Sequence, residues 1–190
     1  MKNNSMTPNP KKWTVQSSDY LIKEAWCTLR ADHVLIPNGA TIPKYYIFEY
    51  PNWVNIIAIT KDKEFLFIYQ YRHGLQQYDY ELPAGVCEET DRSPLETAKR
   101  ELLEETGYGN GKWQQLTVVS PNPGTHTNLC YCFLATELEK IDSPHLDETE
   151  DLQVIKLSLE EVKQLLLEDR IKQSLHATPL WKYMALTKLM

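Results

Sequence analysis

The sequence predicts an α/β protein: a mixed sheet flanked by helices, an α/β/α sandwich, preceded by a small antiparallel sheet. Three observations lead to this prediction. Residues 53–60 (WVNIIAIT) form a nearly continuous apolar run, which is typical of a central buried strand. Helix start signals at Ser93 and Ser158 lie between segments rich in strand-forming residues. Residues 13–51 contain strand-like segments and turns.

The chain before residue 52 is expected to form two parts. Residues 1–12 are polar and are predicted to be a disordered leader. Residues 13–51 are predicted to form a small antiparallel sheet, in which Pro37-Asn38-Gly39 is a strong turn signal. The predicted strands cover residues 20–25, 26–31, 33–36 and 44–50. A sheet of this size rarely stands alone, so we expect it to pack on the main domain or on another subunit.

Residues 52–190 are predicted to form the main domain. The runs 53–60 and 64–71 are joined by the short charged link Lys61-Asp62-Lys63, which favours an antiparallel hairpin. Further strands are expected at residues 80–83, 113–119, 128–136 and 152–157.

Three helices are expected in this domain. The first runs from Pro94 to about Gly107, because Ser93 suits an N-cap, proline suits the first helical position and glycine suits a left-handed C-terminal cap. The second begins after Ser158, which with Glu161 forms a capping box, and continues to about residue 168. The third is predicted at about residues 179–190.

The composition excludes several classes of protein. A chain of 190 residues with 42% hydrophobic and 24% charged residues is ordinary for one globular core with a small appended lobe. The net charge of −6 argues against a nucleic-acid binder, which needs a basic face. There is no apolar run of membrane-spanning length and no signal-peptide core, so no membrane partner and a cytoplasmic location are expected. The four cysteines lack the spacing of a zinc site and are interpreted as buried structural thiols.

The predicted helix at 94–107 carries three glutamates on one face. Glu101, Glu104 and Glu105 stand three and four residues apart, and like charges at this spacing repel by about 0.2–0.5 kcal/mol per pair. A solvated acidic face is the simpler interpretation. A divalent, oxygen-preferring cation such as Mg²⁺, held between the carboxylates, would offset the repulsion and is the interpretation that the spacing and flanks favour.

Residues 81–108 (ELPAGVCEETDRSPLETAKRELLEETGY) resemble the signature of the Nudix hydrolase family. The segment 100–108 (RELLEETGY) matches its second half completely. The first half departs from it, because the loop after Gly85 is one residue longer and Asp91 stands where a glutamate is expected. In the family that glutamate is mainly a structural partner of the arginine. We therefore expect a local bulge in the loop and undisturbed helix glutamates.

Within the family, the chain is similar to the ADP-ribose pyrophosphatase and ADP-sugar diphosphatase branch. The similarity rests on the signature and on WVNIIAIT, YQYRHG and ELPAG between residues 53 and 85, and it extends over about residues 13–186. It implies a Nudix-type α/β/α sandwich and metal-dependent hydrolysis of a nucleoside diphosphate sugar, first of all ADP-ribose to AMP and ribose 5-phosphate. Another nucleotide sugar or a dinucleotide is the alternative substrate. A non-catalytic ligand-sensing module is the alternative class, which the intact glutamates disfavour.

The glutamates of the signature are the expected metal ligands. Glu101 and Glu105, one turn apart, are the principal ligands of Mg²⁺ or Mn²⁺, with Glu104 as an additional or water-mediated ligand. Glu105 is therefore also counted as catalytic. The resemblance implies that the backbone carbonyl of Ala84 completes the coordination.

The general base is expected on a separate element, the acidic loop at 147–151 (DETED). A mobile loop can bring a carboxylate to the attacking water when it closes over substrate. The branch carries its catalytic glutamate on a similarly placed loop, which implies Glu148 as the base and Glu150 as a further metal ligand. A solvated acidic loop is the alternative.

Substrate binding is expected at four further residues. Arg72 can grip phosphate oxygens bidentately, although a surface salt bridge is an equal alternative. Glu81 can hold substrate or a partner side chain at the pocket. Trp26 and Trp53 are candidate platforms for adenine, although packing is the commoner role of a tryptophan. The loop of His126 can border the pocket.

The branch resemblance also implies a homodimer. In such a dimer the N-terminal sheet crosses to the partner subunit.

Overall fold

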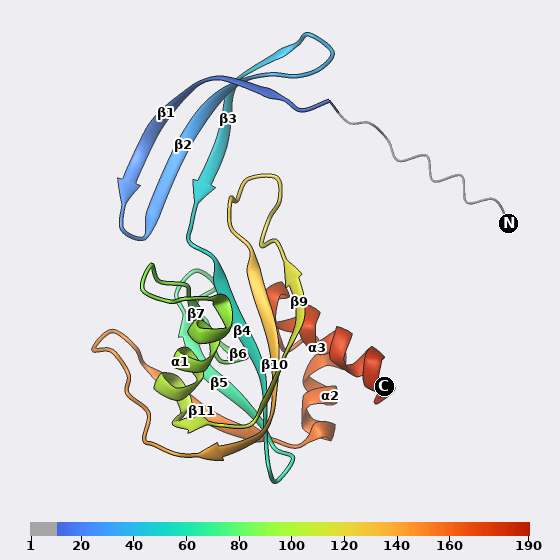
Figure 1. Cartoon of the computed structure of the whole chain (residues 1–190). Helices are drawn as coiled ribbons and strands as arrows, with labels where there is room; N and C mark the ends of the chain where they lie inside the picture. The colour runs from blue at the N-terminus through green and yellow to red at the C-terminus, as the bar shows by residue number, and fades with distance from the viewer. Residues whose placement is uncertain (1–10) are drawn as a thin grey trace, which may run out of the picture. The chain divides into compact units, whose positions relative to one another are not determined.

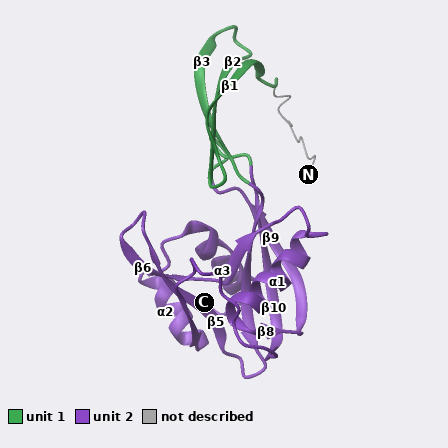
Figure 2. Cartoon of the chain, turned by 90° about the vertical axis from the view of Figure 1, so that its left-hand side faces the viewer, with its two compact units in different colours: residues 1–50, 122–127 green, residues 51–121, 128–190 purple. Residues whose placement is uncertain are grey.

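A computed structural model describes residues 11–190, which form two compact units (Figure 1, Figure 2). Unit 1 ends at Tyr50 and also includes Asn122–Thr127, whereas unit 2 consists of Pro51–Pro121 and Asn128–Met190. The predicted leader, apart from residues 11 and 12, lies outside the described residues. Within the described chain, the helices are too short or too polar to span a membrane.

Unit 1 is a three-stranded antiparallel sheet with the order β1-β2-β3. Its strands are β1 (Thr14–Glu24), β2 (Cys27–Leu35) and β3 (Thr41–Glu49). The turn at Pro37-Asn38-Gly39 is confirmed, because Gly39 has a φ of +90° and the Ala40 N–H donates to Asn38 Oδ1 at 2.9 Å.

Two strand predictions in unit 1 were wrong. The predicted strands 26–31 and 33–36 are one continuous strand, β2, and β1 begins at Thr14, well before residue 20. Asp32 interrupts the apolar pattern of β2, but its buried carboxylate accepts from Ser18 Oγ at 2.6 Å and from Arg30 Nε at 3.0 Å. Because these partners satisfy the buried charge, the strand continues through Asp32.

The loop that contains His126 packs on β3 within unit 1. Phe48 N–H donates to Thr125 O at 2.7 Å, and Thr127 N–H donates back to Phe48 O at 3.1 Å. The His126 ring lies 5.4 Å from the Phe48 ring and 5.5 Å from the Tyr50 ring. The imidazole of His126 is therefore a packing group of this sheet.

Unit 2 is built on a mixed sheet with the order β11-β5-β4-β10-β8, to which β6, β7 and β9 are added beside β5, β4 and β10. Strands β4 and β10 run parallel, and the other pairs are antiparallel. The strands are β4 (Trp53–Thr60), β5 (Phe65–Arg72), β6 (Gln77–Glu81), β7 (Ala84–Val86), β8 (Tyr108–Gly109), β9 (Lys112–Val119), β10 (Cys130–Lys140) and β11 (Leu152–Leu157). The short strands β7 and β8 were not predicted.

Helices cover both faces of this sheet, so the predicted sandwich is confirmed (Figure 1). Helix α1 (Pro94–Thr106) buries Ala98 and Leu102 against apolar side chains of β4 and β10. Helices α2 (Leu159–Leu167) and α3 (Ser174–Thr187) pack on a second core with β4 and β5. Burial on both faces explains why β4 reads as a continuous apolar run.

The caps of α1 and α2 follow the prediction. Ser93 accepts from the Glu96 N–H at 3.3 Å, and Gly107 takes the left-handed conformation with φ +72°. Ser158 and Glu161 form the capping box of α2.

The start of α3 was predicted wrongly. The helix begins at Ser174, so Pro179 lies inside it. A proline has no N–H for the carbonyl four residues earlier, which here is that of Leu175. Asn55 Nδ2 donates to this carbonyl at 2.6 Å and replaces the missing partner. The helix therefore tolerates the proline through a contact with β4.

Candidate active site on helix α1 and strands β5 to β7

Two glutamates of α1 bind the backbone of β7. The Ala84 N–H donates to Glu105 Oε2 at 3.0 Å, and the Val86 N–H donates to Glu101 Oε1 at 3.2 Å. The strand β7 is itself held by antiparallel pairing with β4. The sheet thus fixes both carboxylates, one helical turn apart, beside the Leu-Pro-Ala-Gly segment.

The two carboxylates lie in surroundings that disfavour negative charge. Glu105 is only 7% exposed, and burial, together with the charges of Glu101, Glu150 and Glu81, raises its pKa well above the ordinary value. Burial also raises the pKa of Glu101, to about 7, although Arg100 opposes this shift. Carboxylates in such a site are stabilised by a cation.

Gly85 leaves the space that the Glu101 carboxylate occupies. A Cβ atom at this position would lie 1.9 Å from Glu101 Cδ, which is far inside van der Waals contact. Only a glycine at position 85 of β7 therefore leaves room for this carboxylate in its present position. The close approach of the Glu101 side chain therefore explains, in this chain, why the signature has a glycine at this position.

Arg100 joins the signature loop to α1. Its guanidinium contacts Asp91 Oδ2 at 3.1 Å, Glu104 Oε2 at 2.9 Å, Glu101 Oε1 at 3.0 Å and the Val86 carbonyl at 3.2 Å. Chiefly through the bonds from Arg100, the pKa of Asp91 falls to about 2. Asp91 is thus the partner of the arginine, as the resemblance implied.

The longer loop before α1 is closed by a turn. Asp91 N–H donates to Glu88 O at 3.1 Å, and Glu88 N–H donates to Asp91 Oδ2 at 3.0 Å. This turn absorbs the additional residue at the place where a bulge was expected, and the contacts of Glu101 and Glu105 with β7 are formed.

Glu104 differs from the other two glutamates of α1. Its side chain is 43% exposed and pairs with Arg100. The structure therefore brings Glu101 and Glu105 together at β7 and directs Glu104 to the arginine.

The acidic loop between β10 and β11 starts next to α1. His145 N–H donates to Glu104 O at 2.7 Å, which attaches the loop to the helix. Asp147 N–H donates to Glu150 Oε2 at 3.0 Å, and the charge of Glu150 is one of the causes that raise the pKa of Glu105. Glu148 is exposed on the same loop. The loop thus places Glu150 within electrostatic reach of the buried pair.

Arg72 and Glu81 form an ion pair at the end of the hairpin β5–β6. Arg72 Nε lies 2.6 Å from Glu81 Oε1, and Nη2 lies beside Oε2. Burial opposes ionisation of Glu81, but hydrogen bonds from Arg72 and His176 outweigh it and lower its pKa to about 2. Arg72 thus forms the ion pair that was the alternative to a diphosphate contact, and Glu81 holds a side chain, one of its two expected roles. A substrate contact stays a prediction for both residues.

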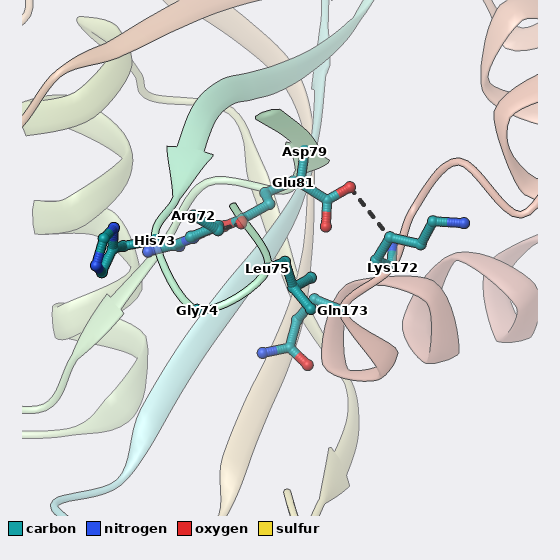
Figure 3. Close-up of a pocket in the computed structure, with 8 residues that line it drawn as sticks. All are labelled: Arg72, His73, Gly74, Leu75, Asp79, Glu81, Lys172 and Gln173. Carbon is teal, nitrogen blue, oxygen red and sulfur yellow. Dashed lines mark hydrogen bonds and ion pairs between the residues drawn. The ribbon is translucent and has the colours of Figure 1, made fainter. Parts of the chain in front are cut away.

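A cavity of about 470 Å³ opens beside this ion pair (Figure 3). Its walls come from the hairpin β5–β6 and from the segment before α3. The residues that line it are Arg72, His73, Gly74, Leu75, Asp79, Glu81, Lys172 and Gln173. Asp79 is buried and accepts from the Lys172 N–H at 3.4 Å, which fastens the two walls together.

The two candidate tryptophans differ in exposure. Trp26 lies in the turn between β1 and β2 and is 85% exposed. Trp53 begins β4 and packs on a small core with Cys130, Cys132 and Leu175. Trp53 therefore packs in the fold, which was the alternative to adenine binding. All four thiols are free, but only Cys130 and Cys132 are buried as predicted; Cys27 and Cys87 are half-buried.

The site fits a divalent cation only with backbone or loop ligands. Across residues 11–190, no three His, Cys, Asp or Glu side chains stand close enough to hold a metal by themselves. The carboxylates of Glu101 and Glu105 nevertheless lie together beside the backbone of β7, and carboxylate and carbonyl oxygens are the ligands that a hard divalent cation takes.

His176 was missed from the sequence. It lies in the first turn of α3, is 5% exposed and contacts both Leu82 and Glu81. A histidine among the apolar residues of LHATPLW is the one signal in the sequence, since such a side chain needs polar partners when buried.

Known proteins are similar to this chain in sequence. The model of the NUDIX domain family matches residues 50–178, and that of the nucleoside diphosphate sugar hydrolase N-terminal domain matches residues 13–48. A methanol dehydrogenase activator of Bacillus methanolicus is 37% identical over 147 residues, 77% of this chain and 78% of that protein. An ADP-ribose pyrophosphatase of Bacillus subtilis is 34% identical over 138 residues, 72% of this chain and 74% of that protein.

A solved structure shows the same fold. The crystal structure of an ADP compounds hydrolase superposes with a TM-score of 0.82 at 22% identity, covering 94% of this chain and 96% of that one. The resemblance read from the signature is confirmed, since the domain match spans well over half of the sequence. The chain belongs to the Nudix hydrolase family.

Proposed function

We propose that this chain hydrolyses the diphosphate linkage of a nucleoside diphosphate sugar, ADP-ribose first of all, to AMP and ribose 5-phosphate. The observation that carries the proposal is the pair Glu101 and Glu105, whose carboxylates both accept hydrogen bonds from the backbone of β7. Two carboxylates in this setting call for a cation, and phosphoanhydride hydrolysis uses one. The relative named ADP-ribose pyrophosphatase supports this choice of substrate.

The metal site in this proposal is made of Glu101, Glu105 and the Ala84 carbonyl, with Mg²⁺ as the ion and Mn²⁺ as the alternative. A bound divalent cation supplies neutralising charge at phosphate oxygens and makes an attacking water more acidic. Glu150 approaches the pair from its loop and serves as a further ligand. Glu104 contributes through Arg100 or through a water.

The remaining roles fall to groups outside α1. Glu148, exposed on the acidic loop, accepts the proton of the attacking water as general base. Arg72 contacts the diphosphate from the rim of the cavity, and Glu81 fixes the orientation of its guanidinium. Trp26, fully available in unit 1, is the better of the two tryptophans for stacking on adenine.

We also propose a homodimer formed through the sheet of unit 1. Strand β1, at one edge of the three-stranded sheet, exposes every one of its side chains, which leaves them available to a partner subunit. A cytoplasmic location remains a prediction from the sequence.

The test is a panel of nucleotide sugars and dinucleotides incubated with the full-length protein and Mg²⁺, with released monophosphate measured. We expect AMP from ADP-ribose, and no AMP when EDTA replaces Mg²⁺. Turnover of another nucleotide sugar without turnover of ADP-ribose would change the assigned substrate but not the type of reaction. Binding of ADP-ribose by calorimetry without any hydrolysis would contradict the enzyme and support a ligand-sensing module.

A further inference from the structure

His176 connects α3 to the hairpin that carries Arg72. Its imidazole is buried, with Nδ1 3.3 Å from the Leu82 nitrogen and Nε2 3.5 Å from Glu81 Oε2. The Leu82 N–H is the donor of the first contact, so Nδ1 carries no proton. In the neutral ring the proton is then on Nε2, the nitrogen that lies 3.5 Å from Glu81 Oε2.

Glu81 in turn holds the guanidinium of Arg72. Its side chain is 3% exposed and accepts from Arg72 through both oxygens, and Gln70 Nε2 adds a contact to Oε2 at 3.2 Å. Arg72 itself is 49% exposed at the rim of the cavity. A half-exposed guanidinium keeps one orientation only if the carboxylate beneath it is fixed.

The docking of α3 does not depend on the contact between His176 and Glu81. Asn55 Nδ2 binds the Leu175 carbonyl at 2.6 Å, and the Lys172 N–H binds Asp79 at 3.4 Å. Leu180 and Met184 are completely buried in the core. These contacts flank His176 on both sides, so its Nε2–H is free to serve another purpose.

We propose that His176 is a positioning residue: through Glu81 it orients the Arg72 guanidinium toward the diphosphate of the substrate. The two ring nitrogens have different roles. Nδ1 accepts from Leu82 and supports the Leu-Pro-Ala-Gly backbone, while Nε2–H fixes the carboxylate that clamps the arginine. The inference rests on the proposed function, because it takes Arg72 as the diphosphate contact.

Two matched variants separate the two nitrogens. In His176→Asn, the amide oxygen reaches the place of Nδ1 and can accept from Leu82, but the donor to Glu81 is lost. In His176→Gln, the longer amide places an N–H near Nε2 and loses the acceptor for Leu82. We therefore expect His176→Asn to raise KM for ADP-ribose about tenfold, with Tm close to that of the wild type. His176→Gln should restore KM to within about threefold while lowering Tm, since it leaves a buried N–H unpaired.

A double variant tests the route through Arg72. Arg72→Lys removes the bidentate contact and should raise KM by itself. Adding His176→Asn should raise KM little further, because both changes act on the same contact. If the increase in KM of the double variant equalled the product of the two single increases, His176 would act independently of Arg72. That result would overturn the proposal.

A spectroscopic measurement keeps the test independent of turnover. In metal-free protein, we expect the Arg72 Nε–H, identified by its absence in Arg72→Lys, to exchange slowly with water. Its exchange should become about tenfold faster in His176→Asn and stay slow in His176→Gln. Equal exchange rates of the Arg72 Nε–H in the wild type, His176→Asn and His176→Gln would show that His176 is purely structural. A KM that rises whenever Tm falls across these proteins would show the same. A wild type without hydrolase activity would refute the proposed function alone, since the exchange measurement still decides the role of His176.

Discussion

At the scale of single residues, Glu105 combines a proposed catalytic role with an energetic cost. Its carboxylate is almost completely buried beside Glu101, and Glu150 and Glu81 add to the negative potential. Removing the charge therefore removes a proposed metal ligand and also relieves repulsion in the metal-free protein. The first effect lowers activity and the second raises the stability of the metal-free protein, so activity and Tm are measured separately.

We expect Glu105→Gln to lower kcat for ADP-ribose by more than about 100-fold. In EDTA, the same variant should melt at a higher temperature than the wild type, because a buried negative charge is gone. Both are measured on the purified protein, by released AMP and by calorimetry. Glu104→Gln, which changes an exposed partner of Arg100, is the matched control and should keep far more activity. Activity like that of the wild type at saturating Mg²⁺ would contradict the assignment of Glu105.

Glu81 makes the stability of the protein depend on pH. Its pKa falls from the ordinary 4.5 to about 2 in the folded protein, where Arg72 and His176 outweigh burial. The carboxylate therefore stabilises the fold fully above pH 4.5, and this contribution is lost as the pH falls toward 2. Between pH 6 and pH 3 the loss amounts to about 2 kcal/mol.

The measurement is urea unfolding of the wild type and of Glu81→Gln at both pH values. The difference in unfolding free energy between the two proteins should be about 2 kcal/mol smaller at pH 3 than at pH 6. Glu160→Gln, at a highly exposed position on α2, controls for the loss of a surface charge. A pH-independent difference would mean that Glu81 is not held as an anion.

The residue types of this site could be predicted from the sequence, but several of their partners could not. Helical spacing places Glu101 and Glu105 together because both lie on one local element. The contact between Glu81 and His176 depends on how α3 docks on the sheet, which no local pattern encodes. The pairing of Glu104 with Arg100 likewise could not be predicted without the position of the signature loop.

At the scale of elements, the approach of β7 to α1 leaves no room for a side chain at Gly85. A Cβ atom there would meet the end of the Glu101 side chain, which is flexible, and no backbone atom lies among its nearest contacts. The fold can therefore accept alanine if the carboxylate moves. We expect Gly85→Ala to keep a Tm near that of the wild type and to lose most activity.

A matched change elsewhere controls for that substitution. Gly74 has nothing within 4 Å of an added Cβ, so Gly74→Ala should keep the Tm of the wild type and controls for the effect of a glycine substitution on stability. A fully active Gly85→Ala would show that the position of Glu101 does not matter for the reaction.

The acidic loop between β10 and β11 carries the proposed base on an element separate from the metal ligands. Glu148→Gln should lower kcat by about 10² to 10⁴-fold and change KM little, because a general base acts on the water and not on substrate affinity. Initial rates over a range of ADP-ribose concentrations measure both constants. Glu160→Gln serves again as the control. An unchanged kcat would move the role of base to Glu150 or to another group.

Element boundaries show where local patterns stop being sufficient. Caps and turns were predicted correctly at α1, α2 and Gly39, since each is decided by a few adjacent residues. The start of α3 was missed because Pro179 is accommodated by Asn55, a residue of β4. The continuity of β2 was missed because Asp32 finds its partners on β1 and within its own strand. In both cases a tertiary contact overrides a local signal.

At the scale of the whole molecule, the sandwich of unit 2 could be predicted because each of its layers has its own sequence pattern. The central strand β4 is buried on both faces and reads as continuously apolar, while the helices carry their own start and stop signals. Unit 1 is different, because its described residues, 11–50 and 122–127, form three strands and no helix. Large side chains remain exposed on β1: Val15, Tyr20, Leu21 and Ile22. These exposed apolar side chains are the reason for proposing an interaction at this strand.

The proposed homodimer follows from this exposed strand. Light scattering at micromolar concentration should give twice the mass of the chain. Tyr20 pairs with Arg30 and Ile22 pairs with Leu29, and these two neighbours on β2 point to opposite faces. Tyr20→Asp and Ile22→Asp therefore probe the two faces of the same sheet. We expect the aspartate on the buried face to weaken the dimer by at least about tenfold and the other to leave it intact. A monomeric wild type, or a dimer that neither variant weakens, would rule out assembly through this sheet.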